Sequence, residues 1–125
     1  AQIERDPLRG ALYENLLIME VVKNLLNQGK ELQLYFFRDS KGNEVDLLVS
    51  SAGRSFTAIE IKSAATFQPE FIKGIDVFRH SSGENADVRS LVWYNGQRKT
   101  TYRNTFVSNP LLHGFQMLLD GPTSA

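Results

Sequence analysis

The sequence has no cysteine, no excess charge of either sign and no long apolar run. Without cysteine these residues form no disulfide and no thiolate metal site, which suits a reducing compartment such as the cytoplasm. The 14 basic residues balance the 14 acidic ones, so contact with nucleic acid would have to come from a local patch. The apolar runs fall far short of the roughly 20 residues that span a bilayer, and no signal-peptide pattern opens the chain. We therefore expect a cytoplasmic domain with no membrane association.

The length and apolar content favour one compact domain. With 125 residues, 42% of them apolar, the chain is long enough for one α/β core and short for two. We therefore treat residues 1–125 as a single domain. The chain starts at Ala1 and the helical pattern begins almost at once, so we expect it to be the C-terminal fragment of a larger protein.

The first half of the chain predicts one helix followed by three strands. Apolar residues recur at helical spacing from Leu8 to Leu26, with Asp6 and Pro7 as a start signal and Gly29 as a stop. Alternating, β-rich segments separated by polar turns then predict three antiparallel strands, at residues 32–38, 44–50 and 55–62.

The second half predicts a helix, a buried strand and a short extension. Pro69 opens a helix in which Phe71, Ile75 and Phe78 form one apolar stripe. Residues 89–94 read as a buried strand. Further on, Asn95-Gly96 predicts a hairpin towards residues 100–103, and residues 110–119 predict a last helix. The predicted order is α-β-β-β-α-β plus a short extension, a mixed α/β plan.

Charged side chains interrupt two of the predicted strands at matching places. Alternation puts Glu60 and Lys62 on one face of their strand. In the preceding strand it puts Asp46 on one face and Val45, Leu47 and Val49 in one apolar layer. If the two strands pair, Asp46 and Glu60 face each other at a separation that one divalent cation could bridge.

Such a pair of carboxylates is typical of a site for a hard cation. Two close, half-buried carboxylates repel each other unless a cation neutralises them, and oxygen ligands favour Mg²⁺ or Mn²⁺. The main-chain carbonyl of Ile61 is a further candidate ligand. Lys62 would lie beside the metal as a compact positive charge. On a helical wheel Glu14 falls on the core-facing stripe with Ile18, where a carboxylate needs a partner.

These residues resemble the PD-(D/E)XK nuclease superfamily. The resemblance lies in Asn43-Glu44-Val45-Asp46 and Ala58-Ile59-Glu60-Ile61-Lys62, after a helix that carries Tyr13-Glu14-Asn15. More narrowly, Gly10-Ala11-Leu12-Tyr13-Glu14-Asn15-Leu16 and Tyr35-Phe36-Phe37-Arg38-Asp39 are similar to the C-terminal uncharacterised domain of prokaryotic AAA+ ATPases. The likeness runs from about Gly10 to Tyr94.

The resemblance implies a restriction-endonuclease-like core and a nuclease site. In that site Asp46 and Glu60 are metal ligands, Lys62 is the catalytic lysine and Glu14 is the supporting helix acid. It also implies an upstream ATPase module, which would be the only source of ATP binding because no G-x-x-x-x-G-K-[ST] occurs here. Val45 stands where the motif has proline. Gln68 matches the first position of a Gln-x-x-x-Tyr motif, but Ile72 stands in the tyrosine position.

Two functions follow, and each residue also has a simpler interpretation. The first is a Mg²⁺-dependent DNA phosphodiester hydrolase; the second is a catalytically silent module that binds DNA or protein and regulates the ATPase, with an oligomer left open. The charged strand residues could instead form a cross-strand ion network, and Glu44 a rim salt bridge. Arg98, Lys99 and Arg103 could contact phosphates or simply protect a sheet edge. We expect Arg38 and Asp39 to form a local ion pair.

Overall fold

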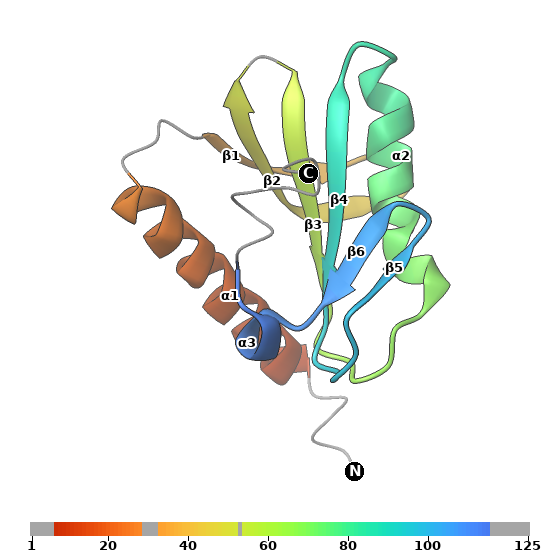
Figure 1. Ribbon diagram of the computed structural model, residues 1–125. Helices are drawn as coiled ribbons and strands as arrows, with labels where there is room; N and C mark the ends of the chain where they lie inside the picture. Colours follow the sequence, from red (N-terminus) through yellow and green to blue (C-terminus); the bar gives the residue numbers. More distant parts are fainter. Residues whose placement is uncertain (1–6, 29–32, 53, 116–125) are drawn as a thin grey trace.

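The computed structural model describes residues 7–28, 33–52 and 54–115, which form a mixed α/β domain. The order α-β-β-β-α-β is confirmed (Figure 1). It consists of α1 (Pro7–Asn27), β1 (Gln33–Arg38), β2 (Glu44–Ala52), β3 (Ser55–Ile61), the 3-10 helix η2 (Pro69–Ile72), α2 (Lys73–Ser82) and β4 (Asp87–Trp93). The extension consists of β5 (Thr100–Tyr102), β6 (Thr105–Ser108) and the short α3 (Pro110–His113).

The six strands form one mixed sheet in the order β1-β2-β3-β4-β6-β5. The pairs β1/β2, β2/β3 and β5/β6 are antiparallel, whereas β3/β4 and β4/β6 are parallel. A parallel pair needs a long crossover, and η2 with α2 supplies the one between β3 and β4. The carboxyl ends of β3 and β4 therefore lie at the same edge of the sheet, near the start of α1 (Figure 1).

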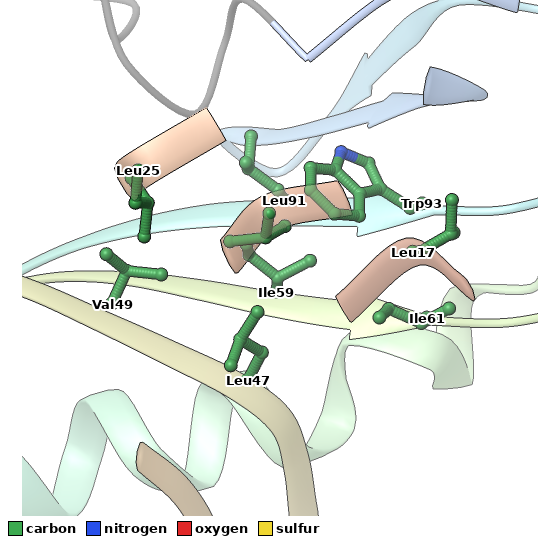
Figure 2. Packing of buried hydrophobic residues seen from close by; sticks show 9 residues of the cluster. Leu17, Leu25, Leu47, Val49, Ile59, Ile61, Leu91 and Trp93 are labelled. Carbon is green, nitrogen blue, oxygen red and sulfur yellow. The ribbon is translucent and has the colours of Figure 1, made fainter. Parts of the chain in front are cut away.

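One face of the sheet packs against α1. Leu17, Val21 and Leu25 of the helix are buried at the helical spacing of four residues and meet the central strands. Figure 2 shows this cluster, in which the strands contribute Leu47, Val49, Ile59, Ile61, Leu91 and Trp93. Burial of these side chains fixes where α1 crosses the sheet, and with it the position of every other side chain on that helix.

The other face of the sheet packs against η2 and α2. The predicted stripe is present: Ile75 is fully buried, Phe78 is 9% exposed, and both join a cluster with Ala58 and Val92. Gly74 brings α2 very close to β2, because a Cβ atom on it would lie 1.8 Å from the carbonyl oxygen of Glu44. Only glycine fits at this contact.

The prediction of one apolar layer from Val45, Leu47 and Val49 is wrong. Leu47 and Val49 pack on the α1 side, but Val45 packs on the α2 side. The cause is a bulge: Tyr35 pairs with Leu48 and Phe37 with Val45, so two residues of β2 stand opposite one of β1. The bulge lies at Asp46 and Leu47, next to the candidate site.

The predicted hairpin at Asn95-Gly96 is also wrong. The strands on either side of it are not neighbours, because β6 lies between β4 and β5. The actual hairpin joins β5 to β6 through Arg103 and Asn104, which adopt the positive φ angles of 49° and 61° that such turns require. The strand β6, which the sequence did not predict, fills the gap through its parallel pairing with β4.

The last predicted helix is shorter than expected. It ends at His113, and Gly114 follows with φ of 88°, so the predicted helix to Leu119 does not continue through Gly114. Residues 116–119 lie outside the described residues, as do the predicted signals at Asp6 and Gly29. Within the described residues no helix is long and apolar enough to cross a membrane.

The face of α1 that points away from the sheet is apolar as well. Leu12, Leu16, Met19 and Leu26 are between 49% and 74% exposed. They lie opposite the buried stripe of Leu17 on the same helix. In the isolated domain α1 is therefore a helix with one covered and one uncovered apolar face.

Candidate functional site

The candidate site lies where β2 and β3 separate. The pairing of these strands ends with Leu47 opposite Ile59, one residue before Asp46 and Glu60 would meet. Beyond this point β3 stays with β4, since the Lys62 N–H donates to the carbonyl oxygen of Trp93 over 2.8 Å. The bulge in β2 thus opens a gap between the strands beside the two acids.

Asp46 and Glu60 bridge this gap with a reciprocal pair of hydrogen bonds. The Ile61 N–H donates to Oδ2 of Asp46 over 2.7 Å, and the Asp46 N–H donates to Oε1 of Glu60 over 3.3 Å. Each carboxylate thereby takes the place of a main-chain carbonyl in the interrupted ladder. These bonds hold both side chains at the break between the strands, and the predicted role of Asp46 and Glu60 as metal ligands stays a prediction.

Lys62 lies beside Glu60. Its Nζ is 3.3 Å from Oε2 of Glu60 and 5.6 Å from the centroid of the Phe71 ring. The ring face attracts the cation and restricts where the ammonium group can lie. The side chain of Lys62 is 40% exposed and that of Glu60 only 9%. The lysine therefore contacts both the buried acid and the solvent.

Glu14 reaches the same place from α1. Partial burial raises its pKa, and the charge of Asp46 and a side-chain hydrogen bond to Asp46 raise it further, while Lys62 acts in the opposite direction. A carboxyl group that hydrogen bonds to another carboxyl group must share a proton with it. The predicted helix acid is therefore in contact with Asp46. We refer to Glu14, Asp46, Glu60 and Lys62 as the acid–lysine cluster.

Burial has its strongest effect on Glu60. Desolvation raises the pKa of Glu60 from its usual 4.5 to about 8, the charge and side-chain hydrogen bond of Asp46 raise it too, and Lys62 lowers it. The charge of Asp46 therefore opposes the ionisation of Glu60. A bound cation would reverse this balance, because it favours the charged form of each ligand.

The donor set suits a hard cation that keeps part of its water shell. Among the described residues, no group of three or more His, Cys, Asp or Glu side chains is placed to hold a metal ion. An ion at Asp46 and Glu60 would therefore need main-chain, water or substrate oxygens as well. Mg²⁺ is commonly bound in this way, by one or two carboxylates together with waters and a phosphate.

The predicted carbonyl ligand of Ile61 stays a prediction. The Ile61 group that contacts the acids is the N–H, which donates to Asp46. Beside the acids, a pocket of about 300 Å³ leaves room for a substrate group. Its lining includes Glu14, Asp46, Glu44 and Arg38.

Other residues considered from the sequence do not join the cluster. Glu44 forms the expected rim salt bridge, with the Nε of Arg38 3.0 Å from its Oε1. The expected ion pair of Arg38 with Asp39 is wrong, because Asp39 accepts hydrogen bonds from Lys41 N–H and from Asn43 in its turn. Gln68 lies outside the cluster, in a second pocket.

Two of the basic residues near β5, Arg98 and Arg103, contact neighbouring tyrosines. The guanidinium of Arg103 lies 5.5 Å from the centroid of the Tyr102 ring. The hydroxyl of Tyr94 accepts from the Arg98 N–H over 3.0 Å and donates to its carbonyl oxygen over 2.8 Å. These contacts shape the loop that leads into β5, and the nucleic-acid role considered for its cations stays a prediction.

The fold and the cluster together define a mixed α/β domain with a buried glutamate, a partly buried aspartate and a lysine at a break between two central strands. A family model matches residues 9–112, which is most of the chain and contains the whole cluster. The chain therefore belongs to the DUF4143 family, described as a domain of unknown function. No curated protein and no solved structure matched it.

Proposed function

We propose that the acid–lysine cluster is the site of a Mg²⁺- or Mn²⁺-dependent phosphodiester hydrolase that acts on DNA. The observation that carries the proposal is the contact of Asp46 with Glu60, held by main-chain hydrogen bonds of 2.7 and 3.3 Å. A buried Glu60 beside the charge of Asp46 is unfavourable unless a cation or a shared proton compensates it. The likeness of the sequence to PD-(D/E)XK nucleases supports the same assignment.

The carboxylates of Asp46 and Glu60 would hold the ion, and their fixed positions would determine where it lies. When bound, the metal would polarise the scissile phosphate and lower the pKa of a water molecule. Asp46 and Glu60 keep lone pairs free for this, since each carboxylate oxygen can accept more than one contact. The fixed main chain limits how far either side chain can turn, which favours a single ligand geometry.

Lys62 would act on charge that develops at the phosphate. Its ammonium group is held at 3.3 Å from Glu60 and against Phe71, yet is 40% exposed. From this position it can contact a phosphate oxygen or orient the attacking water. Glu14 would be a positioning residue, because its contact is with Asp46.

We further propose that this domain works together with an AAA+ ATPase. The proposal rests on the sequence likeness around Gly10 to Leu16 and Tyr35 to Asp39. The uncovered apolar face of α1, with Leu12 and Leu16, is compatible with packing against another domain. ATP would bind to the partner domain, since these 125 residues contain no P-loop motif.

Cleavage of plasmid and single-stranded DNA with Mg²⁺ or Mn²⁺ tests the proposal. The variant for the test is Asp46→Asn, which keeps an oxygen that can accept from the Ile61 N–H but removes the charge. We expect it to lose at least about a hundredfold in rate. Asp76→Asn is the matched control, because it makes the same change at an exposed acid of α2 that pairs with Arg79.

The same experiment separates the two candidate functions. Metal-dependent cleavage that Asp46→Asn abolishes and Asp76→Asn retains supports the hydrolase. DNA binding without cleavage under any metal condition contradicts it, and favours the silent module that binds DNA or protein. Cleavage that is equally strong in the Asp46→Asn variant would place the activity elsewhere or in a contaminant.

A further inference from the structure

A second pocket lies next to the acid–lysine cluster, at the carboxyl ends of the parallel strands β3 and β4. It measures about 370 Å³. Apart from two alanines, it is lined by Arg9, Ser63, Thr66, Gln68 and Asn95. Ligands of open α/β sheets bind outside the carboxyl ends of the strands, because the loops that follow them converge there. This pocket has that position.

The polar lining favours an anion. It comprises one guanidinium, two hydroxyls and two side-chain amides, all of which can donate hydrogen bonds, and it includes no aspartate or glutamate. The first turn of α1 carries no acidic residue either. Among the described residues, no carboxylate forms an ion pair with Arg9. The lining that the structure describes therefore carries one positive charge and no negative one.

The walls of the pocket are fixed to each other. The Asn95 N–H donates to the carbonyl oxygen of Ala64 over 2.9 Å, so the loops that follow β3 and β4 remain joined beyond the strands. Gly96 lies against this loop, since a Cβ atom on it would lie 2.6 Å from the carbonyl oxygen of Ala65. On the other side α1 approaches closely, with the Cβ position of Gly10 3.7 Å from Oγ of Ser63. The main-chain frame of the pocket is thus fixed, while most of its side-chain donors are exposed.

We propose that this pocket binds a backbone phosphate of the nucleic-acid strand, next to the phosphate that the acid–lysine cluster cleaves. The pocket begins at Ser63, directly after Lys62, so the two sites share one chain segment at this edge of the sheet. The phosphates of a strand follow one another along a single backbone, so the phosphate next to the scissile one lies beside it. One strand can therefore occupy both places. This inference rests on the proposed function, because that function supplies the nucleic-acid strand whose phosphate would bind here.

The site would position the strand without reading its sequence. Arg9 neutralises the phosphate charge, and the hydroxyls and amides accept any backbone phosphate alike. The expected effect of losing Arg9 is therefore a weaker affinity for every sequence, with little change in the rate constant of bound substrate. In kinetic terms KM rises and kcat stays close to its original value.

The experiment is metal-free binding of a fluorescent single-stranded oligonucleotide in EDTA, measured by anisotropy over a range of salt concentrations. One lost phosphate contact reduces the single-strand salt slope by about 0.7, which is about fivefold in affinity at 0.1 M salt. We expect this for Arg9→Gln. Lys23→Gln is the matched control, because it removes one positive charge from the same exposed helix at a distance from the pocket. Arg9 is exposed, so folding of the variant is not at risk.

Three results decide the matter. A fivefold loss in Arg9→Gln but not in Lys23→Gln, together with a smaller loss in Gln68→Ala, supports the site. Equal affinity in Arg9→Gln and the original chain overturns it, even where cleavage proves the hydrolase. Titration with inorganic phosphate, followed by the amide resonances of Ser63 and Asn95, tests the source: binding as tight as that of the oligonucleotide would mean a site for free anions and would overturn the strand assignment.

Discussion

Replacing Glu60 by glutamine should remove a pH dependence of stability. In the folded chain, burial and Asp46 raise the pKa of Glu60 from 4.5 to about 8. Between these pH values the folded state holds a proton that the unfolded state releases. The stability of the native chain therefore falls as pH rises from about 4.5 through 8. Glutamine keeps the shape and the acceptor for the Asp46 N–H but has no proton to lose.

The size of the effect follows from the pKa. Each pKa unit corresponds to about 1.4 kcal/mol, so ionising Glu60 in the folded chain costs on the order of 5 kcal/mol more than in the unfolded chain. Between pH 5.5 and 7.5 the native chain should lose about 3 kcal/mol relative to Glu60→Gln. The shielded position of the side chain, 9% exposed, keeps solvent screening small.

Urea unfolding at several pH values measures this difference directly. The free energy of unfolding of each chain is extrapolated to water, and the two are compared at the same pH, so that other titrating groups cancel. Adding Mg²⁺ at pH 8 should recover part of the loss in the native chain alone, since the ion binds the ionised acids. A difference between the two chains that stays constant from pH 5.5 to 7.5 would refute the reasoning.

Two further predictions concern packing. Leu17→Ala should lower the free energy of unfolding by about 2–5 kcal/mol, because Leu17 is fully buried. Leu16→Ala, at a residue 49% exposed, should change it by less than about 1 kcal/mol. Similar losses for the two variants in urea unfolding would contradict the assigned face of α1. Gly74→Ala should destabilise the chain and weaken Mg²⁺ binding, because a Cβ atom would collide with Glu44 and displace the start of β2. Alanine usually stabilises a helix by about 1 kcal/mol relative to glycine. A gain of that size in Gly74→Ala would show that the contact is not as close as described.

Local patterns predicted most elements of this fold. The helical stripe of Leu17, Val21 and Leu25 and the buried stripe of α2 are periodic, and the structure confirms both. The strand β6 was missed because Thr105 to Ser108 is only four residues long, too short for a clear alternation. The Asn95-Gly96 signal failed for a related reason: a hairpin pattern is local, whereas the neighbour of β4 is decided by parallel pairing further along the chain.

The site was predictable in its residues and less so in its geometry. The spacing of Glu60 and Lys62 and the family likeness identified the cluster. The bulge at Asp46 was not predictable, because it depends on the register against β1, and no residue in the sequence marks it. The second pocket was missed for a similar reason. Arg9 and Asn95 are 86 positions apart in the sequence, and they meet because α1 packs across a sheet in which β3 and β4 are parallel.

The two hydrogen bonds across the break in the sheet also affect how inactive relatives should be interpreted. Because Asp46 and Glu60 satisfy main-chain groups that the strands themselves leave unpaired, an apolar replacement of either acid would leave a peptide N–H without a partner. A related domain without catalytic activity would still be stabilised by keeping both acids. Finding both acids in a relative would therefore indicate the same break in the sheet, and would not by itself indicate activity.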